Sequence, residues 1–117
     1  MELSNQNALS LWSGALAESV RSAGPDLSAR QMAILLNVYL GPPPHTVRGL
    51  AASLNVSKPA VTRALDTLSK HGFVRRAPDP QDKRSILVQR TVKGSVFLSE
   101  FSDLIISSAR PIAPQPT

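Results

Sequence analysis

Residues 46–94 read TVRGLAASLNVSKPAVTRALDTLSKHGFVRRAPDPQDKRSILVQRTVKG, and this stretch decides the fold of the chain. Its first segment, Val47 to Leu54, carries apolar residues at helical spacing and follows Thr46, whose side chain suits the cap of a helix. Asn55 then predicts a tight turn, because asparagine tolerates the left-handed backbone conformation better than most residues. The pattern therefore predicts a short helix that ends in a turn.

The segment after this turn predicts a second and longer helix, from Lys58 to His71. Ser57 suits its cap, and Pro59 lies in its first turn, where the missing N–H of proline costs little. Gly72 ends it in the position that glycine commonly takes after a helix. Two helices joined by a turn this short predict a helix-turn-helix.

The hydrophobic pattern beyond this helix changes from helical to extended. Phe73–Arg76 and Ser85–Arg90 predict two short strands, and the polar residues 78–82 between them predict a turn. We expect the two strands to pair as a hairpin, which would add a wing to the helix-turn-helix.

Helices are also predicted on both sides of this stretch. Residues 5–22 and 28–40 each carry an apolar stripe, and the second begins with Ser28 and Gln31 spaced as in a capping box. A last helix is predicted over residues 91–109, with its cap at the first of them. The elements together predict a mainly α (α+β) fold, a winged helix-turn-helix with N- and C-terminal helices around it.

Basic residues concentrate in the middle of the chain. Between His45 and Gly94 there are ten Lys and Arg residues against three Asp, a net charge of +7, whereas the remaining residues sum to −2. A basic block between slightly acidic ends favours a polyanionic partner such as nucleic acid. Charge alone leaves open the alternative of a solvated basic face.

Several classes of function lack the residues that they need. The chain has no cysteine, which excludes disulfides and thiolate metal sites. It shows no nucleophile–base pair, phosphate-binding glycine loop or metal-ligand spacing, so we expect no enzymatic activity, no cofactor and no metal. We also expect no membrane segment and no secretory signal, and therefore a cytoplasmic protein.

Residues 46–94 resemble the MarR family, the multiple antibiotic resistance type of bacterial transcription regulator. The most specific parts of the resemblance are GFVRR at 72–76, DPQDKR at 79–84 and TVKG at 91–94. The resemblance implies a homodimer with winged helix-turn-helix lobes that binds double-stranded DNA sequence-specifically, at a pseudo-palindromic operator. We expect repression, while activation and a small-molecule effector stay open.

The resemblance also implies a division of roles along the chain. We expect a single domain over residues 1–110, with a DNA-reading head at 46–94, dimerisation helices at 5–22 and 91–109, and a disordered tail at 111–117. Apolar residues that one small domain cannot hide mark the interface between the two copies. The candidates are Leu9, Trp12, Leu16, Phe97, Phe101, Leu104 and Ile105.

Within the head, we expect the recognition helix over Ser57–Gly72 and the wing over Phe73–Arg90. The first turns of this helix would enter the major groove and present short or basic groups to bases and phosphates. The candidate contacts are Ser57, Lys58, Pro59, Ala60, Thr62 and Arg63 on the helix and Arg75, Lys83 and Arg84 on the wing. A solvated helix face and a solvated strand edge are the structural alternatives for these residues.

The resemblance also includes the family's DxR wing motif, which matches Asp82 and Arg84. In that motif the aspartate orients the wing and the arginine reaches the minor groove. An acidic group that touched DNA would be repelled, so we expect Asp82 to pair with a neighbouring arginine and fix the hairpin. This sequence departs from the family pattern at Arg90, where leucine is usual, and in its short final helix.

Two other functions compete with sequence-specific DNA binding. One is a winged-helix module that binds protein partners, and the other is a ligand sensor without its own DNA specificity. A protein-docking module should carry acidic or apolar groups where this chain has Lys58, Arg63 and Arg84. The basic recognition helix and wing therefore favour DNA.

The affinity for duplex DNA should depend steeply on salt. Each basic residue that neutralises a phosphate releases counterions, so log affinity plotted against log salt concentration should slope downward by several units. Titrations of one labelled duplex at increasing salt measure this slope. A flat line would remove the electrostatic argument.

Overall fold

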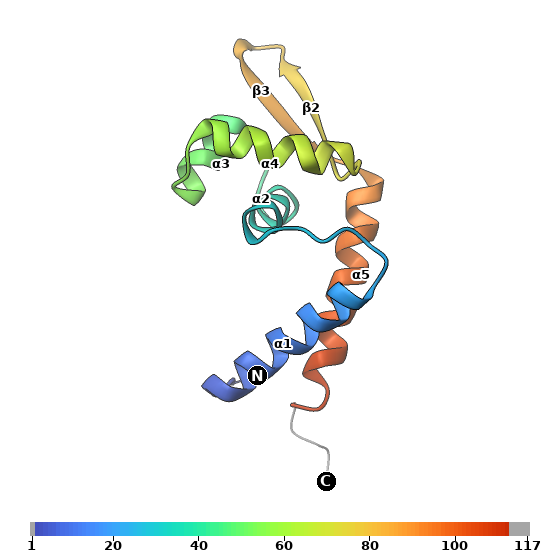
Figure 1. The fold of residues 1–117 in the computed structure, drawn as a ribbon. Coiled ribbons are helices and arrows are strands. Elements are labelled where there is room, and N and C mark those ends of the chain that lie inside the picture. The colour runs from blue at the N-terminus through green and yellow to red at the C-terminus, as the bar shows by residue number, and fades with distance from the viewer. Residues whose placement is uncertain (1, 113–117) are drawn as a thin grey trace. The chain divides into compact units, whose positions relative to one another are not determined.

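The computed structural model describes residues 2–112 and shows a mainly helical chain with a small antiparallel sheet, which confirms the predicted fold class (Figure 1). None of its helices is long and apolar enough to cross a bilayer. The elements in chain order are α1 (Asn5–Arg21), α2 (Ala29–Leu40), β1 (His45–Thr46), α3 (Val47–Leu54), α4 (Lys58–Lys70), β2 (Val74–Asp79), β3 (Asp82–Arg90) and α5 (Val92–Ala109).

The described chain divides into two compact units. Residues 27–96 form the head unit, and residues 2–26 with 97–112 form the helix-pair unit. The predicted DNA-reading head lies wholly within the head unit. Of the predicted disordered tail, residues 111 and 112 are described as part of a turn, and residues 113–117 lie outside the described residues.

The helix ends follow the predicted capping residues. The capping box of α2 is present, because the Ser28 side chain accepts from the N–H of Gln31 and the Gln31 side chain accepts from the N–H of Ser28. Asn55 ends α3 with φ 54° and ψ 47°, in the left-handed region, and Gly72 follows α4 with φ 78°. These local signals fix where the helix-turn-helix begins and ends.

A single apolar core holds the head unit together. α2 places Ile34, Leu35 and Val38 against the helix-turn-helix, and all three are fully buried. The remaining fully buried large side chains come from α3 and α4: Leu50, Val61, Leu65 and Leu68. Burying each large aliphatic side chain stabilises the fold by about 1.5–3 kcal/mol. The packing of α3 and α4 against α2 therefore contributes much of the stability of the head unit.

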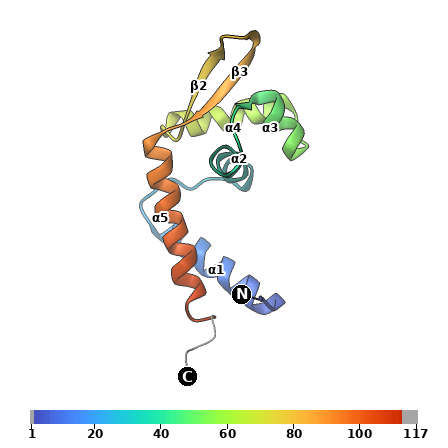
Figure 2. The ribbon, with the colours of Figure 1, turned by 180° about the vertical axis from the view of Figure 1, so that it is seen from behind.

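The sheet differs from the prediction in two ways. Its strand order is β1-β3-β2, and the added strand, His45–Thr46, is too short to leave a pattern in the sequence. The hairpin strands are longer than predicted, so that the turn contains only Pro80 and Gln81. β2 continues through Pro78 because it is an edge strand, where proline is tolerated. Figures 1 and 2 show the hairpin projecting beyond α4.

The hydroxyl group of Tyr39 joins the ends of several elements. It lies 2.8 Å from the carbonyl oxygen of Phe73 and 2.9 Å from that of Thr91, and it accepts a hydrogen bond from the N–H of Thr91 at 2.9 Å. Thr91 in turn caps α5 through the N–H of Gly94 and donates its hydroxyl proton to the carbonyl of Gly72 at 2.6 Å. We call Tyr39, Gly72, Phe73, Thr91 and Gly94 the Tyr39 junction.

Gly94→Ala should destabilise the head unit. A Cβ atom at residue 94 would collide with the Tyr39 hydroxyl and the Phe73 carbonyl, and forced overpacking of this kind costs about 1–3 kcal/mol. Gly24→Ala is the matched control, because its Cβ would meet only the Ser22 hydroxyl, at 3.6 Å. Urea unfolding followed by circular dichroism should separate the two variants. Equal stabilities would mean that the junction is less tightly packed than its geometry indicates.

Candidate nucleic-acid interface

The first turns of α4 form an exposed surface of short and basic side chains. Ser57 caps the helix by accepting from the N–H of Ala60 at 3.2 Å, and Pro59 occupies the first turn. The exposed candidates on this surface are Ser57, Lys58, Pro59, Thr62 and Arg63. The helix thus presents together five of the six residues that were predicted for it.

Ala60 is the exception, and its expected outward position is wrong. Its side chain is only 6% exposed. Ala60 lies one helical turn before Ala64, which is also buried, so both methyl groups pack on the core side of α4. Ala60 therefore allows close packing of the helix and offers no group to a ligand.

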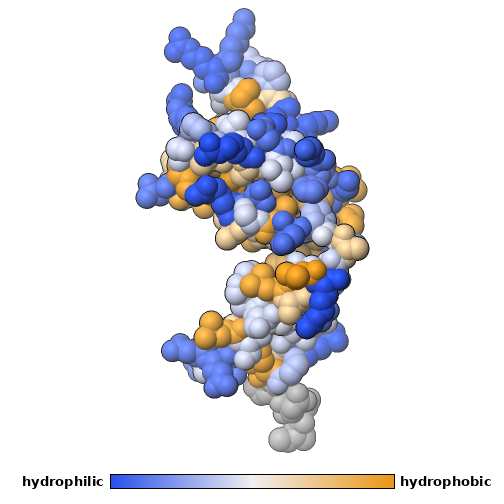
Figure 3. Space-filling view, viewed as in Figure 1, coloured by the Kyte–Doolittle hydropathy of each residue, from blue (hydrophilic) through white to orange (hydrophobic). Residues whose placement is uncertain are grey.

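An irregularity in the hairpin shapes the tip of the wing. Pro78 pairs with Ile86, whereas the next residue, Asp79, pairs with Asp82. The register therefore gives residues 83–85 no partner in β2, and such bulges bend a strand and redirect its side chains. Lys83 and Arg84 lie in this bulge and are exposed. Figure 3 shows hydrophilic residues over the wing tip, at the top of the view.

The carboxylate of Asp82 holds the backbone of this bulge. Its Oδ1 accepts a hydrogen bond from the N–H of Arg84 at 3.0 Å, and Asp79 does the same for Gln81 at 2.9 Å. The expected partner of Asp82 was an arginine side chain, but no ion pair of Asp82 occurs among residues 2–112. Asp82 binds the backbone instead, because a short carboxylate side chain reaches the N–H two residues on, as in an Asx turn.

The basic residues of the head unit fall into two groups. Arg75 donates from Nε and Nη2 to the Gln89 side chain at 3.2 and 3.1 Å, and Arg76 forms an ion pair with Asp66 at 2.8 Å. By contrast, eight basic side chains of this unit form no hydrogen bond or ion pair within the described chain: those of Arg30, Arg48, Lys58, Arg63, Lys70, Lys83, Arg84 and Lys93. This second group includes the exposed basic candidates on α4 and on the bulge, Lys58, Arg63, Lys83 and Arg84.

Arg90 has a structural role that the sequence analysis missed. It donates from Nε to the carbonyl of Val38 and from Nη2 to that of Gly41, both at 2.9 Å, and its guanidinium lies 5.9 Å from the ring centroid of Tyr39. α2 has no basic residue in its own last turn, so Arg90 supplies the donors for its C-terminal carbonyls. The lack of a basic residue in the last turn of α2 was the one sign in the sequence that a distant donor would bind these carbonyls.

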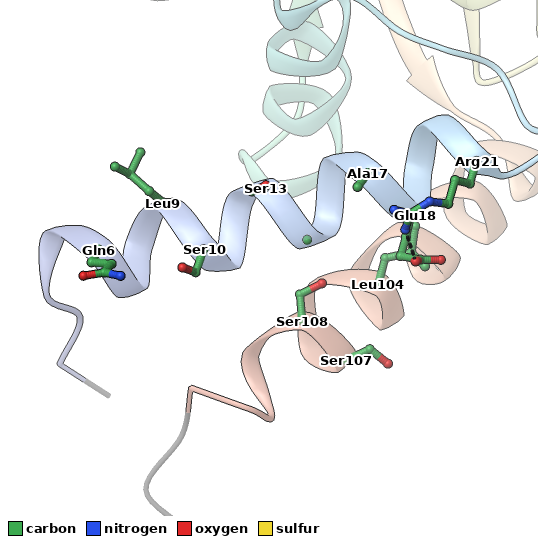
Figure 4. A pocket seen from close by; sticks show the side chains of 11 residues that line it. Gln6, Leu9, Ser10, Ser13, Ala17, Glu18, Arg21, Leu104, Ser107 and Ser108 are labelled. Carbon is green, nitrogen blue, oxygen red and sulfur yellow. Dashed lines mark hydrogen bonds and ion pairs between the residues drawn. The ribbon is translucent and has the colours of Figure 1, made fainter.

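The helix-pair unit exposes much of its apolar stripe. Leu9, Trp12 and Leu16 are 71%, 49% and 42% exposed, and Phe97, Leu104 and Ile105 are half-buried. Phe101 differs from the expectation of an available interface residue: it is only 7% exposed and packs edge-on against Trp12 of the same chain, at a centroid distance of 6.4 Å. An open groove of about 840 Å³ follows α1 and the end of α5, lined by Leu104 and several serines (Figure 4).

Comparisons with curated proteins and solved structures agree with this architecture. The multiple antibiotic resistance protein MarR of Escherichia coli (strain K12) is 34% identical over 80 residues, which span 68% of this chain and 55% of that protein. The HTH-type transcriptional repressor YetL of Bacillus subtilis (strain 168) is 40% identical over 52 residues, or 44% of this chain and 31% of that protein. The chain thus spans at most about half the length of these two relatives.

Solved structures share the fold at lower identity. The transcriptional regulator Tm0710 of Thermotoga maritima superimposes with a TM-score of 0.75 at 23% identity, over 92% of this chain and 72% of that chain. The S. aureus MepR–DNA complex gives a TM-score of 0.68 at 19% identity, over 87% and 78% of the two chains. The MarR family profile matches residues 27–86, just over half of the chain. The protein therefore belongs to the MarR family.

Proposed function

We propose that the protein is a transcription regulator that binds double-stranded DNA with specificity for sequence. The observation that carries this proposal is the coincidence of exposure, charge and missing partners on α4 and the wing. Lys58 and Arg63 on the helix, and Lys83 and Arg84 on the bulge, are exposed and have no bonding partner within residues 2–112. Side chains in this state are available to phosphates and base edges.

The shape of the head unit supports the same function. The major groove is about 12 Å wide and admits one α-helix, so α4 fits it with its first turns toward the bases. In this arrangement Arg63 can bind a guanine edge, Lys58 a guanine or a phosphate, and Ser57 and Thr62 phosphate oxygens. The wing would bring Arg84 to the flanking minor groove, with Lys83 on the backbone. The DNA-bound state of MepR, which shares this fold, supports the assignment.

We also propose a homodimer that binds a pseudo-palindromic operator and represses transcription. Leu9, Trp12 and Leu16 expose an apolar stripe on α1, and contiguous apolar surface of this kind marks an interface. A two-fold dimer carries two recognition helices, so its operator has matching half-sites. The repressor assignment rests on the name of the B. subtilis relative and on the family expectation.

Arg63→Ala should weaken binding to the preferred operator more than to random duplex. If Arg63 contacts a guanine, the loss on the operator is about 1–3 kcal/mol, whereas a phosphate contact would lower both affinities alike. Arg30→Ala is the control. Arg30 is an exposed arginine like Arg63, but it lies on α2, outside the candidate surface. Equilibrium titrations with both duplexes measure the ratio. An equal loss on the two would reassign Arg63 to the backbone.

Asp82→Ala should weaken DNA binding by about two- to tenfold, which corresponds to one lost hydrogen bond of about 0.5–1.5 kcal/mol in the bulge. Asp82→Asn should bind nearly as well as the wild type, because the amide oxygen can still accept from the N–H of Arg84. Both variants remove one negative charge, so a purely electrostatic view predicts that both bind more tightly. Tighter binding by Asp82→Ala would contradict the positioning role.

A further inference from the structure

The ion pair between Asp66 and Arg76 joins the recognition helix to the wing. Arg76 Nη1 lies 2.8 Å from Asp66 Oδ1, and the two side chains are 31% and 60% exposed. Asp66 is the sole acidic residue of α4, and it lies three residues beyond Arg63 on the exposed side of the helix. An unpaired carboxylate at this position would repel the phosphates that the helix is to approach.

The place of Arg76 in the hairpin allows the ion pair to control the position of the hairpin tip. Arg76 is opposite Val88 of β3, and Val88 is in turn opposite His45 of β1. At this level of the sheet β3 is held by β1, and β2 is held by the contact with α4. β1 pairs with β3 for one residue more, at Leu87, and beyond that residue the hairpin runs on to the bulge with Lys83 and Arg84 as a two-stranded arm (Figures 1 and 2). A small rotation at the level of Arg76 therefore moves the arm tip by a larger distance.

We propose that Asp66 and Arg76 are positioning residues that set the angle between the recognition helix and the wing. This inference rests on the proposed function. The pair holds the arm so that Arg84 reaches the minor groove while α4 occupies the major groove. Neither residue needs to touch DNA for this role. Because Arg76 is paired with Asp66, it is not counted among the residues available to phosphates.

The alternative role for the pair is purely electrostatic. In that case Arg76 is a phosphate contact that Asp66 partly neutralises, and the removal of Asp66 frees it to bind more tightly. The two roles differ in their effect on Arg84, to which neither residue is joined by a hydrogen bond or an ion pair within the described chain. Exposed ion pairs contribute little to folding stability, so the variants should remain folded, which thermal unfolding verifies.

The first test is a double-mutant cycle on operator affinity. Arg84→Ala should cost about tenfold in the wild type, since it removes a groove contact. In the Asp66→Asn or Arg76→Gln background it should cost less than about threefold, because the wing no longer presents Arg84 correctly and the two sites are coupled. Asp26→Asn is the matched control: it removes the same charge outside the head unit, and the tenfold cost should persist.

The second test needs no DNA and uses the lack of cysteine in the chain. Spin labels at Gln81→Cys, in the wing turn, and Lys70→Cys, at the end of α4, report the distance between arm and helix by pulsed electron resonance. The labelled chain is mixed with excess unlabelled chain, so that each assembly carries one labelled copy. The distance distribution should be narrow in the wild type and in Asp26→Asn, and broader in Asp66→Asn and Arg76→Gln.

The outcomes separate this inference from the proposed function. An unchanged distance distribution in Asp66→Asn overturns the positioning role, and so does a full Arg84 penalty in that background. Tighter binding by Asp66→Asn with the penalty intact supports the electrostatic role instead. Failure of the wild type to prefer any duplex refutes the proposed function, while the broadening of the distance distribution would still be measurable.

Discussion

The hydroxyl group of Tyr39 is the constraint on which the head unit depends. It extends from α2, the central helix of the core, and makes hydrogen bonds just after the end of α4 and just after the end of β3. A polar group in a part-buried place is stable only when its partners are present, so the junction exists only when these segments are all in position. Gly94 completes it, because any larger residue would occupy the space of the hydroxyl.

The same junction explains why Arg90 has a structural role in the head unit. Its guanidinium covers the Tyr39 ring and binds the last carbonyls of α2. Arg75 and Arg76 are likewise engaged with Gln89 and Asp66. The net charge of the middle segment therefore overstates how many basic groups are available to a polyanion, because three of its ten Lys and Arg residues are engaged within the head unit.

Local sequence predicted the parts of the fold that local physics controls. The helix ends at Ser28, Asn55 and Gly72 follow from capping and from the left-handed conformation, and each is confirmed. The existence of the hairpin followed from the alternating pattern, but its length did not. The edge position of β2, which admits Pro78, is a property of the whole sheet.

The candidate site was predictable in outline and not in its pairings. The exposed face of α4 followed from helical periodicity, apart from Ala60, whose small side chain suits either face of a helix. The partners of Arg76 and Arg90 could not be predicted, because Asp66 lies on another element and the carbonyl of Val38 is 52 residues from Arg90. Such contacts are set by tertiary packing, which no local pattern encodes.

The central claim is that α4 and the wing bind a specific duplex sequence as a symmetric pair. Selection of bound duplexes from a random pool tests it most directly, with no prior choice of operator. The account predicts enrichment of a pseudo-palindrome whose half-sites lie about 10 base pairs, or a multiple of this, apart from centre to centre. A pool that stays random after repeated rounds at physiological salt would contradict it.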